Sequence, residues 1–364
     1  MVRRLETTPK RDGYRMPAEF SPHKKTWLIW PERSDTWRLG AKPAQAAFAK
    51  VACAIAEFEP VTMCVGAKYF ESVREALPAH IQVVELSTND AWMRDIGPTF
   101  VVNDKGGVRG IDWGFNAWGG LHGGLYFPWD LDMQVKAKIL ELEQCDRYGA
   151  RDFILEGGAI TVDGEGTVLT TKQCLLHPNR NAQLSEKQIE NKLKDYLSVE
   201  KVIWLERGMA DDETDGHIDE LAFFVRPGEV ALSWTDDPLN PHYAIVREAF
   251  ETLSQATDAQ GRKLIVHKVP LPRPIRMTAE ESKGLDLSIT SFPREGGTLF
   301  VASYVNCYLC NGGVIIPGFD DPLDERAKHI FQNLYPDRRV VQVQTREIAL
   351  GGGNIHCITQ QQPL

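Results

Sequence analysis

The chain has 364 residues, of which 43% are hydrophobic and 25% are charged, a composition typical of an ordinary globular protein. This composition excludes a collagen, a coiled coil and a disordered chain. The 41 Lys and Arg residues against 50 Asp and Glu residues leave a net charge of −9, which argues against a nucleic-acid partner and favours a small cationic ligand.

Short apolar runs that are typical of strands alternate with amphipathic helical patterns along the whole chain. Strands are expected at 61–65, 81–86, 202–205, 221–225, 229–234 and 340–344. Helices are expected after Pro43 and at 67–77, 130–145, 185–197 and 324–335. The first of these helices has one apolar stripe, which consists of Ala44, Phe48, Val51, Ile55 and Phe58. This alternation predicts an α/β protein.

Two helix starts have recognisable capping residues. Asp130 stands before the 130–145 pattern and is expected to cap it. Ser185 and Gln188 have the spacing of a capping box at the start of the next long helix.

The chain contains no Ser-rich or Gly-rich linker that would divide it, although its length is ordinary for two domains. The segment 155–160 (LEGGAI) resembles the segment 350–355 (LGGGNI), and each opens a strand-like run. Paired glycines at the start of strands indicate close backbone approach, and their recurrence suggests one repeated module.

Seven cysteines form an odd set without the spacing of a disulfide framework. Reduced thiols are therefore expected. Cys307 and Cys310 lie in an apolar run and lack the second pair of ligands that a zinc site requires, so we expect them to pack in the core. The N-terminus has no apolar stretch of signal-peptide length and nothing approaches the length of a membrane span, which predicts a cytoplasmic protein without membrane association.

Polar residues gather in four turn-like segments, each of which adjoins a predicted strand: 89–98, 155–158, 211–220 and 351–357. In the third segment His217 and Asp219 are two residues apart, so in an extended backbone both side chains point to the same face. This pairing suits a proton carrier beside a cation-binding carboxylate, whereas a capped surface turn is the structural alternative. The EF-hand spacing is not present in this segment, which argues against calcium.

The fourth segment presents Cys357 directly after three glycines and an Asn. A single cysteine is more often a small buried hydrophobe than a nucleophile, but here the glycines expose the backbone ahead of it. His356 is its neighbour, and adjacent residues of a strand face opposite sides. We therefore expect His217, rather than His356, to activate the Cys357 thiol.

Two further acidic residues stand at turns, Asp95 before Gly-Pro and Glu156 before two glycines. A turn cap or an edge charge is the ordinary explanation for each. Trp92, Trp113 and Trp118 lie in loops rich in Gly or Asp, where an exposed ring can stack on a planar cation.

Taken together, these segments resemble the agmatine deiminases, of the guanidine-modifying hydrolase and amidinotransferase superfamily. The resemblance covers almost the whole chain and includes MPAEFSPHKKTWLIWPERSDTWR, NDAWMRDIGPTFVV, DWGFNAWGG, LEGGAITVDGEGTVLTT, DETDGHID, SYVNCYLCNGGVIIP and REIALGGGNIHCITQQQP. The segments NDAWMRDIGPTFVV and REIALGGGNIHCITQQQP are the most specific. The resemblance implies a pentein fold, in which five pseudo-symmetric αβ modules form a propeller around an axial site. This fold would make residues 1–364 a single catalytic domain.

The resemblance also implies the chemistry. Cys357 is the expected nucleophile toward the guanidinium carbon of agmatine, Asp95 and Asp219 hold the guanidinium nitrogens, His217 moves protons, and Glu156 orients His217. The products would be N-carbamoylputrescine and ammonia, with no metal and no cofactor. Glu213 is expected to meet the substrate amine, and Trp92 and Trp113 are expected to line the slot. A homo-oligomer is a further expectation.

Three other readings compete with this one. A related deiminase could act on arginine or on peptidyl-arginine, and a metal hydrolase could use His217, Asp219 and Cys357. A non-enzymatic ribosome anti-association factor shares the five-module propeller, so the fold alone does not establish catalysis. Such a binding protein would have no reason to keep one Cys, one His and three carboxylates in these motifs.

Overall fold

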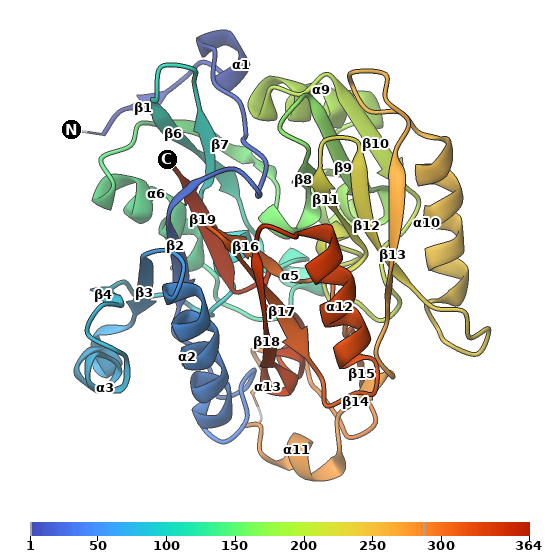
Figure 1. Ribbon diagram of the computed structural model, residues 1–364. Helices are drawn as coiled ribbons and strands as arrows, with labels where there is room; N and C mark the ends of the chain where they lie inside the picture. The colour runs from blue at the N-terminus through green and yellow to red at the C-terminus, as the bar shows by residue number, and fades with distance from the viewer. Residues whose placement is uncertain (1, 287) are drawn as a thin grey trace.

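The computed structural model describes residues 2–286 and 288–364 and shows a mixed α/β protein (Figure 1). In Figure 1 the helices α3 (Phe70–Ala76), α9 (Glu186–Leu197) and α10 (Tyr243–Gln255) lie at the rim of the molecule, and the strands lie nearer its middle. The α/β class expected from the sequence is confirmed.

Five of the six sheets formed by the described residues are built in the same way: two antiparallel strands are followed by a helical crossover to a third strand, which pairs parallel with the second. In the first example β5 (Thr99–Val102) pairs antiparallel with β6 (Val108–Gly114), and β6 then pairs parallel with β7 (Arg147–Ile154). Helix α6 (Asp132–Leu142) joins the two parallel strands. A parallel pair requires such a crossover, whereas an antiparallel pair needs only a short turn.

The same order of hairpin, helix and parallel strand recurs along the chain. The recurrences are β8 (Thr161–Val162), β9 (Thr167–Thr171), α9 and β10 (Lys201–Leu205); β11 (Ala222–Arg226), β12 (Glu229–Trp234), α10 and β13 (Ile265–Pro270); and β16 (Tyr308–Cys310), β17 (Gly313–Gly318), α12 (Asp324–Leu334) and β18 (Arg339–Gln344).

The fifth sheet joins the two ends of the chain. Its first strand is the C-terminal β19 (Thr359–Pro363), which pairs antiparallel with β2 (His23–Ile29). Strand β2 continues through α2 (Lys42–Ala56) into the parallel β3 (Val61–Val65). Figure 1 shows the dark red β19 beside the blue β2. The last strand of the chain therefore completes the first unit.

The remaining elements extend these units or connect them. They are β1 (Arg4–Leu5), α1 (Pro9–Asp12), η1 (Ala67–Tyr69), β4 (Gln82–Glu85), α4 (Met93–Ile96), α5 (Gly120–Gly123), η2 (Gly157–Ala159), α7 (Lys172–Leu175), α8 (Pro178–Asn181), η3 (Ile218–Glu220), β14 (Ile275–Arg276), α11 (Ala279–Lys283), β15 (Leu299–Phe300) and α13 (Arg346–Ala349). Strand β1 adds to β7, β4 adds to β3, and β14 pairs only with β15.

One predicted helix start is confirmed and another is wrong. Ser185 and Gln188 form the expected capping box of α9. Asp130 does not cap α6, which begins at Asp132 without a side-chain cap. The carboxylate of Asp132 instead accepts the backbone N–H of Asn89 at 2.6 Å, so this helix start is held by the loop in front of α4.

The first strand of each unit is preceded by a turn that carries polar side chains. The residues in these turns are Asp95 before β5, Glu156 before β8, His217 and Asp219 before β11, Asn306 before β16, and Cys357 before β19. All six are buried. Equivalent positions of the five units thus supply the candidate site.

Candidate active site

Three of the predicted site residues gather around Gly158, in η2. A Cβ atom on Gly158 would lie 2.6 Å from Nδ1 of His217, 2.9 Å from Oδ2 of Asp219 and 3.1 Å from Oδ1 of Asp95. The first two distances are shorter than real side-chain carbons show and the third is tight, so a side chain at this position would displace all three groups. Turns from three different units therefore meet at one point.

Cys357 joins this group from the C-terminal unit. Its Sγ lies 3.5 Å from Oδ2 of Asp219, and Nδ2 of Asn306 donates a hydrogen bond to it at 3.2 Å. A Cβ on Gly353 would lie 2.9 Å from this sulfur and 2.8 Å from the ring of Trp92. The Trp92 ring and the thiol thus both lie beside Gly353, and the role of Trp92 in lining the substrate slot stays a prediction.

The surroundings of Cys357 are acidic. Burial and the nearby carboxylates of Asp219, Glu220 and Asp95 raise the pKa of the Cys357 thiol well above its ordinary value. The thiol is therefore protonated in the free site at neutral pH.

Asp95 is fixed by donors from both sides. The backbone N–H of Gly158 donates to Oδ1 and the indole Nε1 of Trp118 donates to Oδ2, each at 2.9 Å. Nζ of Lys136 holds the backbone carbonyl of Asp95 at 2.9 Å. Burial, which outweighs the nearby His217, raises the pKa of Asp95. The carboxylate is held in place and lies ready for a cation.

Asp219 belongs to a buried chain of charges. Its Oδ2 lies 2.8 Å from Nδ1 of His356, and Nε2 of His356 lies 2.8 Å from Oε1 of Glu19. Arg94 then donates to Glu19 at 3.3 Å. Burial raises the pKa of Asp219, but the hydrogen bond and charge of His356 outweigh burial and lower it. Oδ1 of Asp219 has no hydrogen-bond partner among the described residues.

His356 is the functional residue that the sequence reasoning set aside. In a strand, His356 and Cys357 would face opposite sides. The structure has a turn there, directly before β19, and His356 orients Asp219 instead of contacting the thiol. The Gly-Gly-Gly-Asn sequence that precedes it is a turn signal and was the available clue.

His217 lies between two carboxylates. Its Nδ1 is 3.9 Å from Oδ2 of Asp95 and its Nε2 is 3.9 Å from Oε2 of Glu156. Burial alone would lower the pKa of His217, but Asp95, Cys174 and Asp219 outweigh it and raise the pKa well above the ordinary value. The imidazole is therefore positively charged near neutral pH and can donate a proton.

The His217–Asp219 pair converges by a different backbone route from the one expected. The residues between them are not extended, because η3 begins at Ile218. The backbone N–H of His217 donates to Oδ2 of Asp212 at 2.9 Å, which fixes the turn.

Glu156 is held by Arg180 of α8. Nε of Arg180 donates to Oε1 of Glu156 at 2.7 Å, and its Nη1 donates to Asp215 at 2.8 Å. Both the Arg180 and Glu156 side chains are fully buried. Asp215 thus supports the residue that holds Glu156.

Cys174 of α7 lies in the same layer as Glu156 and His217. One donor atom from each of these three residues lies within 4.8 Å of the other two, and all three residues are buried. Among the described residues, these three form a group that could hold a metal ion.

Trp113 is a correction to the prediction. It lies in β6 and packs between Phe153 and Tyr196, in a different hydrophobic cluster from Cys357, and its Nε1 donates to Thr99. The strand carries its ring into the core. Trp118, which binds Asp95, is the aromatic residue of this loop that reaches the site.

Glu213 lies near the glycines that precede Cys357, but it is already paired. Nε and Nη2 of Arg294 donate to its two oxygens at 3.0 and 2.6 Å. A Cβ on Gly352 would come within 2.3 Å of Oε2, so this ion pair borders the 351–353 loop. Any substrate amine at Glu213 would have to share its carboxylate with Arg294.

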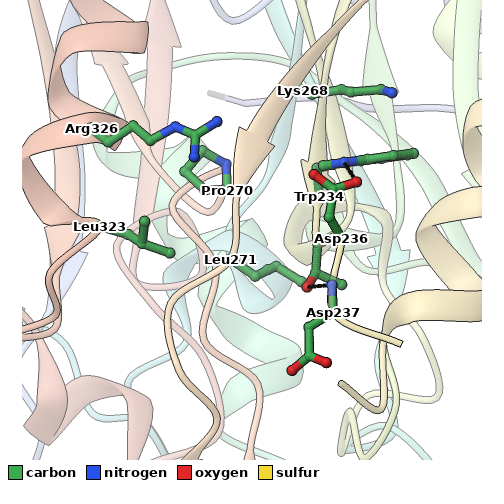
Figure 2. Close-up of a pocket in the computed structure, with 9 residues that line it drawn as sticks. Trp234, Asp236, Asp237, Lys268, Pro270, Leu271, Leu323 and Arg326 are labelled. Carbon is green, nitrogen blue, oxygen red and sulfur yellow. Dashed lines mark hydrogen bonds between the residues drawn. The ribbon is translucent and has the colours of Figure 1, made fainter. Parts of the chain in front are cut away.

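A surface groove of about 410 Å³ lies apart from these residues (Figure 2). Its walls come from Trp234 at the end of β12, from Lys268 in β13 and from Arg326 in α12. Figure 2 shows that Lys268 and Trp234 lie on one side of the groove and Arg326 on the other. None of the predicted site residues lines this groove.

Among the residues that the structure describes, no helix combines the length and the apolar character needed to cross a bilayer.

Comparison with known proteins gives a consistent result. The model of the Porphyromonas-type peptidyl-arginine deiminase family matches residues 15–363. An agmatine deiminase of Pseudomonas aeruginosa is 58% identical over 358 residues, which cover 98% of this chain and 97% of that protein. An agmatine deiminase of Pseudomonas syringae is 54% identical, with 99% of this chain and 98% of that protein covered.

The solved structures agree with the sequence relatives. The structure of an agmatine deiminase of Enterococcus faecalis, described as catalysing its reaction, superposes with a TM-score of 0.97 at 51% identity. The alignment covers 100% of this chain and 99% of that one.

Proposed function

Since the chain belongs to the Porphyromonas-type peptidyl-arginine deiminase family, we propose that it is an agmatine deiminase, which hydrolyses agmatine to N-carbamoylputrescine and ammonia. The observation that carries the proposal is the position of the Cys357 thiol, 3.5 Å from the Asp219 carboxylate, in a buried site that Asp95 and His217 share. Full-length identity of 58% to a protein named agmatine deiminase supports the choice of substrate.

Asp95 and Asp219 hold the substrate guanidinium. Two carboxylates placed beside Gly158 match the planar fork of N–H donors of a guanidinium group. Each has a fixed direction, because Trp118 and Gly158 hold Asp95 and His356 holds Asp219. The carbon between the guanidinium nitrogens remains positively charged and therefore electrophilic.

The bound guanidinium also activates the nucleophile. In the free site, carboxylates raise the pKa of Cys357, and the arriving positive charge opposes them and favours the thiolate. Asn306 donates to the sulfur at 3.2 Å and stabilises the same form. The thiol therefore loses its proton to solvent when the substrate is in place.

The reaction then proceeds in two halves. The Cys357 sulfur forms a C–S bond with the guanidinium carbon, His217 protonates one nitrogen, and the C–N bond breaks to release ammonia. Neutral His217 next removes a proton from water and the oxygen attacks the amidino carbon. The C–S bond then breaks to regenerate the thiolate, the C=O bond of the product forms, and the remaining hydroxyl proton passes to solvent. Water is consumed once and ammonia leaves once, so the atoms balance.

Glu156 keeps His217 in position for both halves. Its Oε2 faces Nε2 of His217 at 3.9 Å while Arg180 holds the other oxygen. A charged carboxylate behind the imidazole stabilises the imidazolium that each half requires.

The substrate tail is the less defined part of the proposal. Trp92 borders Cys357 and can pack against the aliphatic chain of agmatine. Glu213 stays a prediction for the amine, which would share this carboxylate with Arg294. Trp113 has no part in the tail site.

The alternative function is deimination of arginine or of peptidyl-arginine. The name of the matching family favours it, whereas the relatives above 50% identity are named for agmatine. A non-catalytic binding protein is disfavoured because one thiol, one imidazole and three carboxylates from four turns converge here.

We also infer that residues 1–364 form a single catalytic domain, in which the five units surround a pseudo-symmetric axis as a propeller. The repeated connection and the closure of the first unit by β19 support this arrangement. The site residues precede the first strands of the five units, as expected for turns that face a common axis. A cytoplasmic location and a homo-oligomer remain predictions.

The proposal is tested by measuring ammonia release from agmatine, arginine and a blocked arginine peptide. Agmatine should have the highest kcat/KM, and Cys357→Ala should abolish turnover. The matched variant Cys64→Ala, at a buried thiol of β3 outside the proposed site, should retain it. Mass spectrometry of enzyme quenched in acid should find the amidino adduct on Cys357. Activity of Cys357→Ala, or faster turnover of arginine, would contradict the corresponding part.

A further inference from the structure

A second thiol lies behind the proposed proton carrier. Cys174 is fully buried, and one donor atom each from Cys174, Glu156 and His217 lies within 4.8 Å of the other two. The three side chains come from α7, from the turn before β8 and from the turn before β11. The fold thus places a thiol, a carboxylate and an imidazole together, although the chemistry proposed above uses only two of them.

Two of the three donor atoms have no hydrogen-bond partner. Oε2 of Glu156 and Nε2 of His217 are both buried and face each other at 3.9 Å, and neither has a hydrogen-bond partner among the described residues. Buried polar atoms are normally satisfied, because leaving one unpaired costs about 1–3 kcal/mol. Their separation beside a thiol is one that a single bound ion can bridge.

The surrounding residues hold the three groups in place. Arg180 binds Oε1 of Glu156 at 2.7 Å and leaves Oε2 directed to His217. Thr171 accepts the backbone N–H of Cys174 at 3.2 Å and donates to the carbonyl of Gly216 at 2.6 Å. Outer hydrogen bonds of this kind orient ligands in metal sites.

We propose that Glu156, Cys174 and His217 form a binding site for a thiophilic divalent cation of the Zn²⁺ class, and that its occupation inhibits the enzyme. A thiolate, an imidazole nitrogen and a carboxylate oxygen are the ligands that Zn²⁺ prefers, with a water in the fourth position. Mg²⁺ and Ca²⁺ prefer sets of oxygen ligands and are not expected to bind. A dication would be neutralised by the Cys174 thiolate and the Glu156 carboxylate.

Binding of the ion is accompanied by proton release. The S–H bond of Cys174 loses its proton, Nε2 of His217 supplies a lone pair, and the displaced protons pass to solvent. The inhibition rests on the proposed function, in which His217 must alternate between imidazolium and imidazole. A metal on Nε2 prevents the imidazolium form, whereas Asp95 and Asp219 stay free for the guanidinium. The ion should therefore lower kcat and leave KM within about two-fold, since it removes a proton-transfer step rather than substrate binding.

Co²⁺ is the probe that tests the site, because a bound thiolate gives it a near-ultraviolet charge-transfer band. Titration of the full-length enzyme should develop this band, and it should persist in Cys357→Ser, which lacks the proposed nucleophile. Cys174→Ala should weaken both Co²⁺ binding and the inhibition by Zn²⁺ by at least about ten-fold. The matched variant Cys64→Ala should leave both unchanged. Cys174→Ser should behave like Cys174→Ala and provides a second variant if the first does not fold.

The outcomes separate this proposal from the assignment of substrate. A band that disappears in Cys357→Ser, or Zn²⁺ sensitivity that is unchanged in both Cys174 variants, would overturn the site. If wild-type enzyme fails to turn over agmatine, the substrate proposal fails, but the Co²⁺ band still reports whether Cys174 binds the ion.

Discussion

Gly158 is the residue around which the proposed reaction centre packs, and Gly158→Ala tests that packing directly. The φ angle of Gly158 lies outside the left-handed region, so alanine adds one methyl group without forcing a strained backbone. The methyl carbon would lie 2.6 Å from Nδ1 of His217, whereas ordinary contact begins at 3.4 Å. The imidazole would therefore have to retreat by about 0.8 Å, and Asp219 and Asp95 by smaller amounts.

A shift of this size has a predictable cost. A misplacement of about 1 Å at a reacting group reduces the rate by about 10²-fold. We expect kcat/KM for agmatine to fall about 100-fold, which corresponds to about 2.7 kcal/mol of lost transition-state stabilisation. The backbone N–H of residue 158 still donates to Asp95 in the variant, so the methyl group alone is tested.

Steady-state ammonia release measures the activity of each variant, and thermal unfolding of the same preparations shows whether the variant is folded. Gly123→Ala is the control, because its new methyl carbon would meet only Nδ2 of Asn179, at an ordinary 3.6 Å. We expect Gly123→Ala to change kcat/KM by less than about two-fold, since it creates no close contact at the site. A folded Gly158→Ala enzyme with nearly wild-type activity would refute the convergence of His217, Asp219 and Asp95 on the reacting atoms.

Three further substitutions test the residues that support this centre. Asn306→Ala removes the donor to the Cys357 sulfur and should lower kcat/KM by about 10-fold or more, because hydrogen bonds to charged groups contribute about 1.5–3 kcal/mol; the acidic limb of its pH–rate profile should move to higher pH, and an unchanged limb would contradict the role. Arg180→Ala leaves the Glu156 carboxylate buried without its partner and should reduce the free energy of unfolding, measured in urea, by about 3–5 kcal/mol; a loss below about 1 kcal/mol would show that the charge is relieved in another way. His356 and Arg94 outweigh burial and lower the pKa of Glu19 from 4.5 to about 2, so its ionised form stabilises the fold above about pH 4.5 and this stabilisation is lost as the pH falls toward 2. Glu19→Gln should accordingly flatten the pH dependence of the urea midpoint over that interval, and an equally steep profile in the variant would contradict the assignment.

The sequence predicted the α/β class and several individual helices because the relevant signals are local. The apolar stripe from Ala44 to Ile55 is buried in α2, and the capping box of Ser185 and Gln188 opens α9. The unit formed by β19 and β2 could not be recognised in this way, because its first strand lies at the opposite end of the chain from the others. Only pairing in three dimensions joins them.

Some residues of the candidate site could likewise be predicted from local sequence signals, and others could not. Asp95, Glu156, His217, Asp219 and Cys357 stand in turns rich in Gly or Asp, and such turns are visible in the sequence. Their supporting residues are not visible, because each acts across a large separation along the chain. Asn306 lies 51 residues from Cys357 and Glu19 lies 337 residues from His356.

Trp113 shows why residue type in a loop-like segment is an incomplete guide. Trp113 and Trp118 stand five residues apart in one Gly-rich stretch. The first still belongs to β6 and faces the core, and the second lies beyond the strand and binds Asp95. The end of the strand decides which ring reaches the site, and strand ends are the feature that local patterns define least well.

The same carboxylates determine both the negative charge of the site and the protonation state of the Cys357 thiol. The carboxylates that would bind the substrate cation are also those that raise the pKa of Cys357 in the free site. A neutral molecule of the same shape could fill the site but would leave the thiol protonated, because it would bring no charge to oppose Asp219 and Asp95. Discrimination between a guanidinium and a neutral isostere should therefore be larger in kcat than in KM, since positive charge both binds the substrate and produces the nucleophile. On this argument the acidity of the site controls reactivity as well as affinity, and the buried Cys357 thiol remains unreactive until its proper substrate arrives.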